Sequence, residues 1–394
     1  MASIAEDADP ALAEFIHTNS LPADVTSQLS GLSLRDCVSL LYDKDRSALL
    51  GALEERGLKL PVRQKFANKL GAASRSGVPG ICESEDEILA RSAWLDGGGE
   101  VAPSTDENEE PPWSHSERRF LVFTSAGDAN AVTSWVQGWT GRGAAAARFG
   151  GGGGGPGGGR DWDLCVAYYG DDEATPSCMA VADHSVRIKG GKFPNLLACL
   201  RRQRPYFAGF ESILVADDDL QGIDADGLSA LFHARRHLDA WVLQPANNPM
   251  AGKADIRETQ AQPGIAYRFV NFCEVTAPLF RTDKLFEFLH HYHPRRHEGA
   301  PLVGYGIDCW FCQLLLGVSA DGSGACTHQD KAAVVDCVPF VNPTNEDKAH
   351  GREIDRLQSF HKRVEEWEAV AKRRGLAVWY PQATLKTVPL ETAA

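Results

Sequence analysis

The chain has 394 residues, of which 43% are hydrophobic and 24% are charged, so it is long enough for two globular domains. Its net charge of -13 argues against a nucleic-acid partner, and an anionic substrate would need local cations or a metal ion. The ten cysteines form no compact disulfide framework, and no signal peptide or long apolar segment is visible. We therefore expect reduced thiols, no membrane span and a cytoplasmic protein, with a Golgi-associated protein as the alternative.

Residues 1–75 carry the pattern of several short helices. Ser33 and Asp36 are spaced like a capping box, Gly57 is placed to end a helix, and Pro61 fits the first turn of the next. This pattern predicts a small all-α bundle. The order of its helices resembles that of a sterile alpha motif (SAM) domain, which implies self-association or a protein partner through residues 1–75. An unrelated helical cap is the alternative.

Two segments have the composition of flexible chain. Residues 76–117 combine glycines with an acidic run, which predicts a flexible acidic linker between two domains. Residues 141–160 are dominated by glycine and lack the GxxxxGK[ST] pattern of a phosphate-binding loop. We interpret this second segment as a surface insertion in a domain that spans 118–394.

From residue 118 onward, apolar strand-like segments alternate with helical patterns. Strands are expected at 120–123, 163–169, 185–188, 213–216, 240–244, 266–276 and 333–338. Helices are expected at 131–139, 196–200, 228–238, 283–291, 304–316 and 352–374. This alternation predicts an α/β domain with a mixed, mostly parallel sheet flanked by helices.

Three acids, Asp217, Asp218 and Asp219, follow directly after the apolar strand at 213–216. Ligands of open α/β sheets bind at the carboxyl ends of such strands. Adjacent carboxylates repel one another unless a cation lies among them, and Mg²⁺ or Mn²⁺ is commonly completed by substrate phosphates. The motif therefore predicts a metal–diphosphate site, and a solvated acidic turn is the alternative.

Two further motifs have candidate roles. Lys189 and Lys192 flank two glycines before a helix, which is typical of an anion-binding turn, although a plain basic turn is the alternative. Cys309 and Cys312 form a CxxC without a second CxxC for zinc. Because they lie in an apolar helical pattern, we expect two buried thiols.

Residues 118–355 resemble a plant and microbial family named domain of unknown function 707 (DUF707), whose members look like glycosyltransferases of the GT-A fold. The matching segments are 120–127, 162–170, 189–195, 215–220, 243–246, 271–280, 302–311 and 351–355. The resemblance implies a Rossmann-like first half and a DxD motif whose outer acids, Asp217 and Asp219, hold a divalent ion on a nucleotide-sugar diphosphate. His350 is a candidate third metal ligand. The candidate substrate-binding residues are Lys189, Lys192, Asp218, Gly304 and Gly306.

The resemblance also nominates a catalytic acid. Asp308, in the segment Gly-Tyr-Gly-Ile-Asp, is placed like the acid of the glycine-rich GxED-type motif of inverting GT-A enzymes, although this chain has Ile307 where that motif has Glu. Asp308 would take the proton of the acceptor hydroxyl. A helix N-cap is the alternative role.

Together these motifs predict a metal-dependent glycosyltransferase that moves a sugar from a nucleotide sugar to an unknown acceptor. Two alternatives remain open. One is a phosphatase-like hydrolase with Asp217 as nucleophile and Asp219 as general acid. The other is a non-catalytic protein that binds nucleotides or sugars.

Overall fold

The computed structural model describes residues 9–19, 21–22, 24–40, 46–75, 113–114, 116–141, 149, 159–172, 174–292, 302–344, 354 and 358–390. The chain divides into two compact units, Met1–Glu87 and Ile88–Ala394. Nearly all of the linker expected at 76–117 and most of the insertion expected at 141–160 lie outside the described residues. The bounds of both segments therefore stay predictions.

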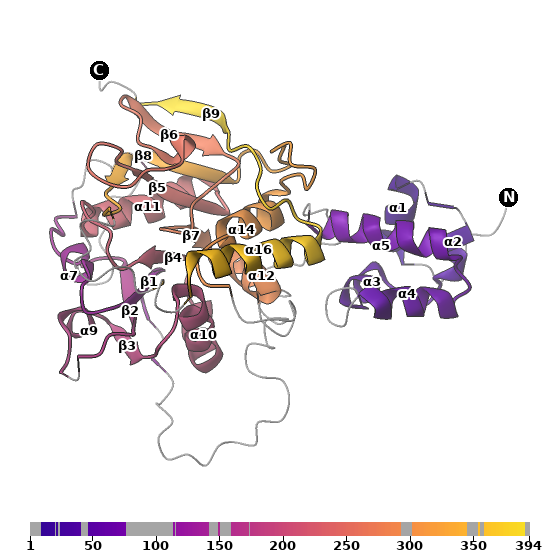
Figure 1. The fold of residues 1–394 in the computed structure, drawn as a ribbon, viewed down its shortest axis with the longest axis horizontal. Helices are drawn as coiled ribbons and strands as arrows, with labels where there is room; N and C mark the ends of the chain where they lie inside the picture. The colour runs from indigo at the N-terminus through magenta and orange to yellow at the C-terminus, as the bar shows by residue number, and fades with distance from the viewer. Residues whose placement is uncertain are drawn as a thin grey trace, which may run out of the picture. The chain divides into compact units, whose positions relative to one another are not determined.

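The first unit is a bundle of the helices α1 (Pro10–Thr18), α2 (Asp24–Gln28), α3 (Leu34–Ser39), α4 (Arg46–Glu55) and α5 (Leu60–Arg75) (Figure 1). Their apolar side chains share one core, where the rings of Phe15 and Phe66 have centroids 5.5 Å apart. The capping box is present. Ser33 Oγ accepts from the Asp36 N–H, and the Asp36 carboxylate accepts from the Ser33 N–H. The small all-α bundle is confirmed, and its likeness to a SAM domain stays a prediction.

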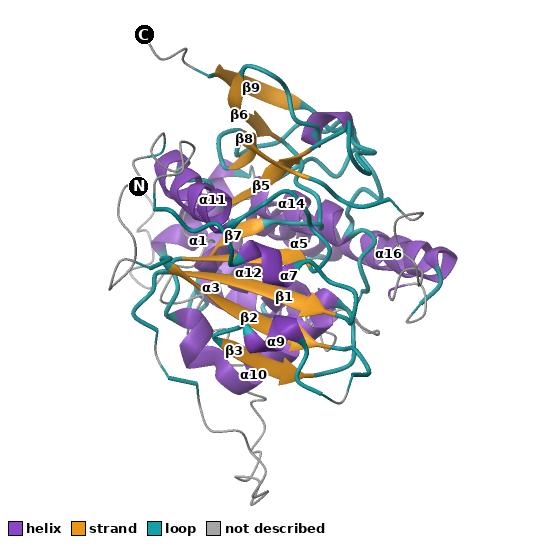
Figure 2. Ribbon diagram, turned by 90° about the vertical axis from the view of Figure 1, so that its left-hand side faces the viewer, coloured by secondary structure: helices purple, strands orange, loops and turns teal. Residues whose placement is uncertain are grey.

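The second unit is built on a mixed sheet whose described strands have the order β3-β2-β1-β4-β7-β5-β8-β6-β9 (Figure 2). The strands are β1 (Phe120–Ala126), β2 (Trp162–Tyr168), β3 (His184–Arg187), β4 (Ser212–Asp217), β5 (Val242–Asn247), β6 (Ile265–Val270), β7 (Leu279–Arg281), β8 (Ala332–Phe340) and β9 (Thr384–Pro389). β7 and β6 run in the opposite direction to the other described strands of the sheet. The mixed, mostly parallel sheet is therefore confirmed.

Helices cover both faces of this sheet. One face packs against α10 (Lys192–Ala208), α12 (Thr282–Tyr292), α14 (Ile307–Leu316) and α16 (Phe360–Arg374). The other packs against α7 (Val132–Trp135), α9 (Ser177–Ala180) and α11 (Ala225–Leu238). Every residue of β1 and β2 is buried. Such two-sided burial explains why these strands are continuous apolar runs.

Several expected elements have different bounds in the structure, and α10 is longer than the helix expected at 196–200. The helix expected at 131–139 is only the short α7, and the helix expected at 352–374 is described from Phe360, with Ser359 as its N-cap. The strand expected at 266–276 ends at Val270. The next residue, Asn271, donates its side-chain amide to the carbonyls of Gly324 and Pro381, so the chain leaves the ladder there.

The structure also describes the state of the cysteines and the length of the apolar helices, about which the composition made predictions. The nine cysteines that the structure describes are free thiols. Cys309 and Cys312 are buried in α14, which confirms the interpretation of the CxxC. Among the described helices, none combines the length and the apolar character needed to cross a membrane.

Candidate functional site

Charged side chains gather where β4 and β5 end and where the chain returns after β6. β4 ends at Asp217 and β5 at Asn247. The segment 274–276 runs along the ends of both strands, because Thr276 O accepts from the Asp217 N–H at 2.8 Å and the side chain of Gln244 accepts from the Glu274 N–H. The topology thus creates one polar site at the sheet edge where α/β proteins bind ligands.

Lys192 lies in the middle of this site. It is the first residue of α10, and its Nζ is 2.6 Å from Asp217 Oδ1, 2.5 Å from Val275 O and 3.1 Å from Thr276 O. The Lys192 side chain is only 11% exposed, whereas that of Asp217 is 39% exposed. A nearly buried ammonium thus balances part of the negative charge at the end of β4.

The three consecutive acids have different surroundings. Asp217 faces Lys192, whereas Asp218 Oδ2 accepts from the backbone N–H of Gly127 at 2.8 Å. Burial and the negative charges of Asp219 and Asp217 raise the pKa of Asp218 to about 7, against the effect of that hydrogen bond. Asp219 is half-buried in the turn that follows.

Asp308 approaches the same site from α14. Its Oδ1 accepts from the Cys309 N–H at 2.9 Å, and the Val275 N–H also donates to its carboxylate. Burial raises the pKa of Asp308 to about 6, although these donors and the nearby Lys192 favour its charged form. The N-cap of α14 is Gly306, so the alternative role of Asp308 as the N-cap is wrong.

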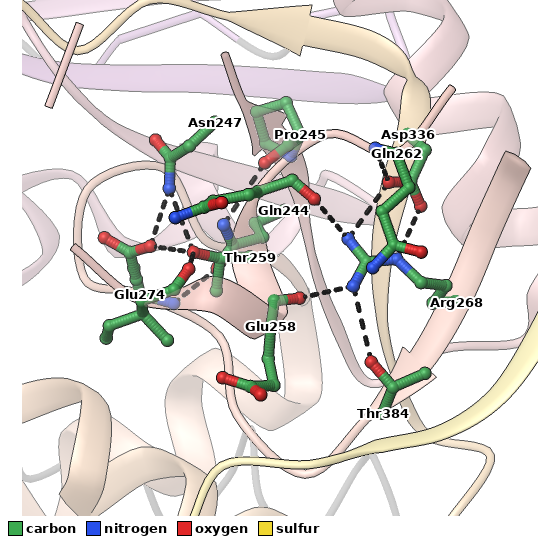
Figure 3. Close-up of polar contacts among 12 residues, drawn as sticks. Gln244, Pro245, Asn247, Glu258, Thr259, Gln262, Arg268, Glu274, Asp336 and Thr384 are labelled. Atoms are coloured by element: carbon green, nitrogen blue, oxygen red, sulfur yellow. Dashed lines mark hydrogen bonds and ion pairs between the residues drawn. The ribbon is translucent and has the colours of Figure 1, made fainter. Parts of the chain in front are cut away.

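Glu274 is a carboxyl group of the site that the sequence patterns missed. Its Oε1 accepts from Asn247 Nδ2 at 2.6 Å and from the Thr259 hydroxyl (Figure 3). Burial, followed by the charges of Asp308 and Asp255, raises the pKa of Glu274 to about 7. The available signal is a single acid in an apolar, aromatic segment, but the loose alternation of 266–276 favours a strand there.

A buried ion pair fixes the segment that carries Thr259. Arg268 of β6 and Asp336 of β8 are fully buried and joined by two contacts of 3.0 Å. Arg268 also donates to Glu258 O at 2.8 Å and to Gln260 O at 2.6 Å, while Asp336 accepts from a backbone N–H at residue 262 (Figure 3). The pair therefore holds 258–262 against the sheet, with Thr259 beside Glu274.

Lys189 and the two glycines have contacts of their own. Lys189 Nζ lies 2.5 Å from Asp171 and donates to the Gly170 carbonyl beyond the end of β2. Gly304 and Gly306 have φ of 83° and 81°, and a Cβ on Gly306 would lie 2.2 Å from the Trp367 ring. Backbone conformation and packing thus account for glycine at 306. Substrate contacts of these three residues stay predictions.

The carboxylates at the end of β4 are chemically suited to bind a divalent cation. Asp217 and Asp219 supply hard oxygen donors, and Mg²⁺ is usually held by one or two carboxylates together with substrate phosphates and water. Within the described ranges, no three His, Cys, Asp or Glu side chains are grouped to hold a metal ion. The expected third ligand, His350, lies outside the described residues. The described part of the chain would therefore supply two carboxylates to such an ion.

Comparison with known proteins gives little further information. No model of a known protein family matches the chain, and no curated protein matches its sequence. Among solved structures, the chain is similar to residues 1–349 of the glycosyltransferase TarS of S. aureus, with 12% identity and a TM-score of 0.36. The match covers 65% of this chain and 71% of that chain. A likeness at this level carries no argument about function.

Proposed function

We propose that the protein transfers a sugar from a nucleotide-sugar donor to a hydroxyl group of an acceptor, with the help of Mn²⁺ or Mg²⁺. The observation that carries this proposal is the meeting of Asp217, Lys192 and Asp308 around residues 275–276 at one edge of the sheet. Such a site offers both negative and positive groups to a metal–diphosphate. The resemblance of 118–355 to the DUF707 family agrees with it.

On the donor side, Asp217 and Asp219 would hold the ion, with His350 as the candidate third ligand. The bound ion would neutralise the diphosphate and stabilise it as a leaving group. Lys192 adds a fixed positive charge beside Asp217, which favours an anionic ligand close to three acids. Asp218, Lys189, Gly304 and Gly306 are the remaining candidates for substrate contacts.

On the acceptor side, the attacking hydroxyl must lose its proton as it bonds to the sugar. A carboxyl group whose pKa is close to the working pH performs this step best. The pKa of Asp308 is raised to about 6 by burial, and Asp308 is the acid that the family resemblance nominates. The N-terminal bundle would act separately, as a module for self-association or for binding a protein partner.

A thermal-shift screen of nucleotide sugars with and without Mn²⁺ tests this function. A ligand that binds the native state at 100 times its dissociation constant adds about 2.7 kcal/mol to stability. We expect at least one nucleotide sugar to raise the melting temperature, and only when Mn²⁺ is present. Stabilisation without any turnover would favour the non-catalytic binding protein, and phosphate release from a sugar-free phosphate ester would favour the hydrolase.

A further inference from the structure

Glu274 is held by one carboxyl oxygen only. Oε1 accepts from Asn247 Nδ2 at 2.6 Å and from the hydroxyl of Thr259. Oε2 has no hydrogen-bond partner among the described residues, and Figure 3 shows it turned away from Thr259. The side chain is partly exposed. One oxygen of Glu274 is thus fixed by the protein, and the other accepts from no group that the structure describes.

The side-chain amide of Asn247 is oriented with its nitrogen toward Glu274. Its Nδ2 donates to Glu274 Oε1 and to Thr259 Oγ1, the latter at 3.1 Å. Its Oδ1 is buried without a partner in the part of the chain that the structure describes. Leaving a buried oxygen unpaired costs free energy, so the contacts of Nδ2 must offset that cost. In this orientation Asn247 Nδ2 faces the Glu274 carboxylate, and Asn247 Oδ1 is left without a hydrogen bond from any described residue.

Asp308 differs from Glu274 in how its charge is stabilised. Its carboxylate accepts from the backbone N–H groups of Cys309 and Val275, and it lies near Lys192 in the first turn of α14. These donors and the helix N-terminus favour the charged form. Glu274 faces two acids instead, Asp308 and Asp255, and with burial they raise its pKa to about 7. Asp308 is thus held by backbone donors, whereas the Glu274 carboxylate accepts, among the described residues, only from two side chains, and both contacts are made by Oε1.

We propose that Glu274 takes the proton of the acceptor hydroxyl through Oε2, an inference that rests on the sugar transfer proposed above. The hydroxyl oxygen forms a bond to the anomeric carbon of the sugar. The bond from that carbon to the diphosphate oxygen breaks, and its electron pair leaves with the nucleoside diphosphate. The hydroxyl proton passes to Glu274. This assignment replaces Asp308, which the family resemblance nominates for the same step. Asp308 is then a positioning residue that ties α14 to Val275, next to Glu274.

The full chain with Mn²⁺ tests the proposal, with UDP-glucose, UDP-galactose, UDP-N-acetylglucosamine and GDP-mannose as probes. With water as the acceptor hydroxyl, the readouts are release of UDP or GDP and, by calorimetry, the affinity for the same nucleotide. We expect Glu274→Gln to lower release at least about 100-fold, since a general base contributes 10²–10⁴-fold. Its nucleotide affinity should stay within about twofold.

Two further variants separate a proton-transfer role from a structural one. Glu258→Gln is the matched control, because Glu258 contacts Arg268 through its backbone carbonyl and Figure 3 draws no contact to its carboxylate. Release by this variant should stay at the wild-type level. Glu274→Ala should recover release when sodium formate is added, because the small carboxylate replaces the missing base. Formate has no such effect on a variant that has merely lost packing.

The outcomes distinguish this inference from the proposed function. If the wild type binds neither UDP nor GDP, or binds nucleotide but releases none from any probe, the proposed function is wrong and the inference falls with it. If the wild type releases nucleotide, the inference alone is wrong in either of two cases. These are release by Glu274→Gln close to that of the wild type, and loss of nucleotide binding in both Glu274 variants without rescue by formate.

Discussion

Acids that lie at one edge of the sheet differ in what holds them. Asp217 is paired with a lysine, Asp218 accepts from a backbone N–H, and Glu274 accepts from an amide and a hydroxyl. Desolvation and neighbouring acids raise the pKa of both Asp218 and Glu274 to about 7. The pKa values of both groups therefore lie close to neutral pH, well above those of an ordinary aspartate or glutamate.

The raised pKa of Glu274 predicts a specific dependence of stability on pH. Its pKa is about 7 in the folded state and 4.5 in the ordinary carboxyl group, so the folded state binds the proton more tightly between these values. Its contribution to the free energy of unfolding therefore falls as pH rises through this window. The glutamine that replaces Glu274 does not titrate, so the free energy of unfolding of Glu274→Gln minus that of the wild type should rise between about pH 5 and about pH 8. The expected rise is on the order of 1–3 kcal/mol. Urea denaturation measures this difference, and a value that is constant with pH contradicts the assignment.

At the level of elements, the position of Glu274 depends on a loop that the sheet holds in place. Arg268 on β6 and Asp336 on β8 are neighbours because these strands pair, with Arg268 opposite Val334. Through its contacts with 258–262, this pair places Thr259 beside Glu274. Removing one partner of a buried pair leaves the other charge uncompensated.

We expect Arg268→Leu to lower the free energy of unfolding by about 3–5 kcal/mol, because Asp336 would be left buried and unpaired. The control is Lys331→Leu, which removes the pair with Asp239, whose side chain is 66% exposed. That variant should cost at most about 1 kcal/mol. Chemical denaturation compares the two, and equal effects would contradict the expectation that the buried Arg268–Asp336 pair matters more for stability than the exposed pair.

The elements that the sequence predicts well are those with local signals. Ser33 and Asp36 are three residues apart, and the acids after strand 213–216 are adjacent to it, so each motif could be recognised within one short window. Glu274 could not, because Thr259 and Asn247 lie 15 and 27 residues before it. The same applies to β9, whose pairing with β6 joins segments more than 100 residues apart. Contacts of this kind depend on the topology of the sheet, which no local pattern encodes.

At the scale of the whole chain, the N-terminal unit has a core of its own. Leu12, Phe15, Leu53 and Phe66 are buried together with other residues of the same bundle. A bundle with its own core, followed by an acidic segment of low hydrophobicity, has the organisation of an independently folding module. Its role in association would then be separable from the chemistry of the second unit.

Limited proteolysis tests this separation. We expect cleavage within residues 97–112, because their composition is that of a flexible spacer, and two stable fragments that keep their structure. The fragment 1–75 should then be examined by sedimentation for self-association. A single resistant body would show that the units do not separate, and a fragment that stays monomeric at high concentration would leave only a different protein as its partner.

The central claim is that the acids after β4 bind a divalent ion together with a nucleoside diphosphate. Calorimetry of UDP and GDP with and without Mn²⁺ tests it most directly, on wild type, Asp219→Asn and, as a control, Asp330→Asn, which alters an acid that is 70% exposed. Because ion and diphosphate each neutralise charge for the other, their binding should be reciprocally coupled. We predict at least about tenfold tighter nucleotide binding with Mn²⁺ in wild type and Asp330→Asn, and no such gain in Asp219→Asn. Equal affinity in every condition, or no binding in any, would contradict the account.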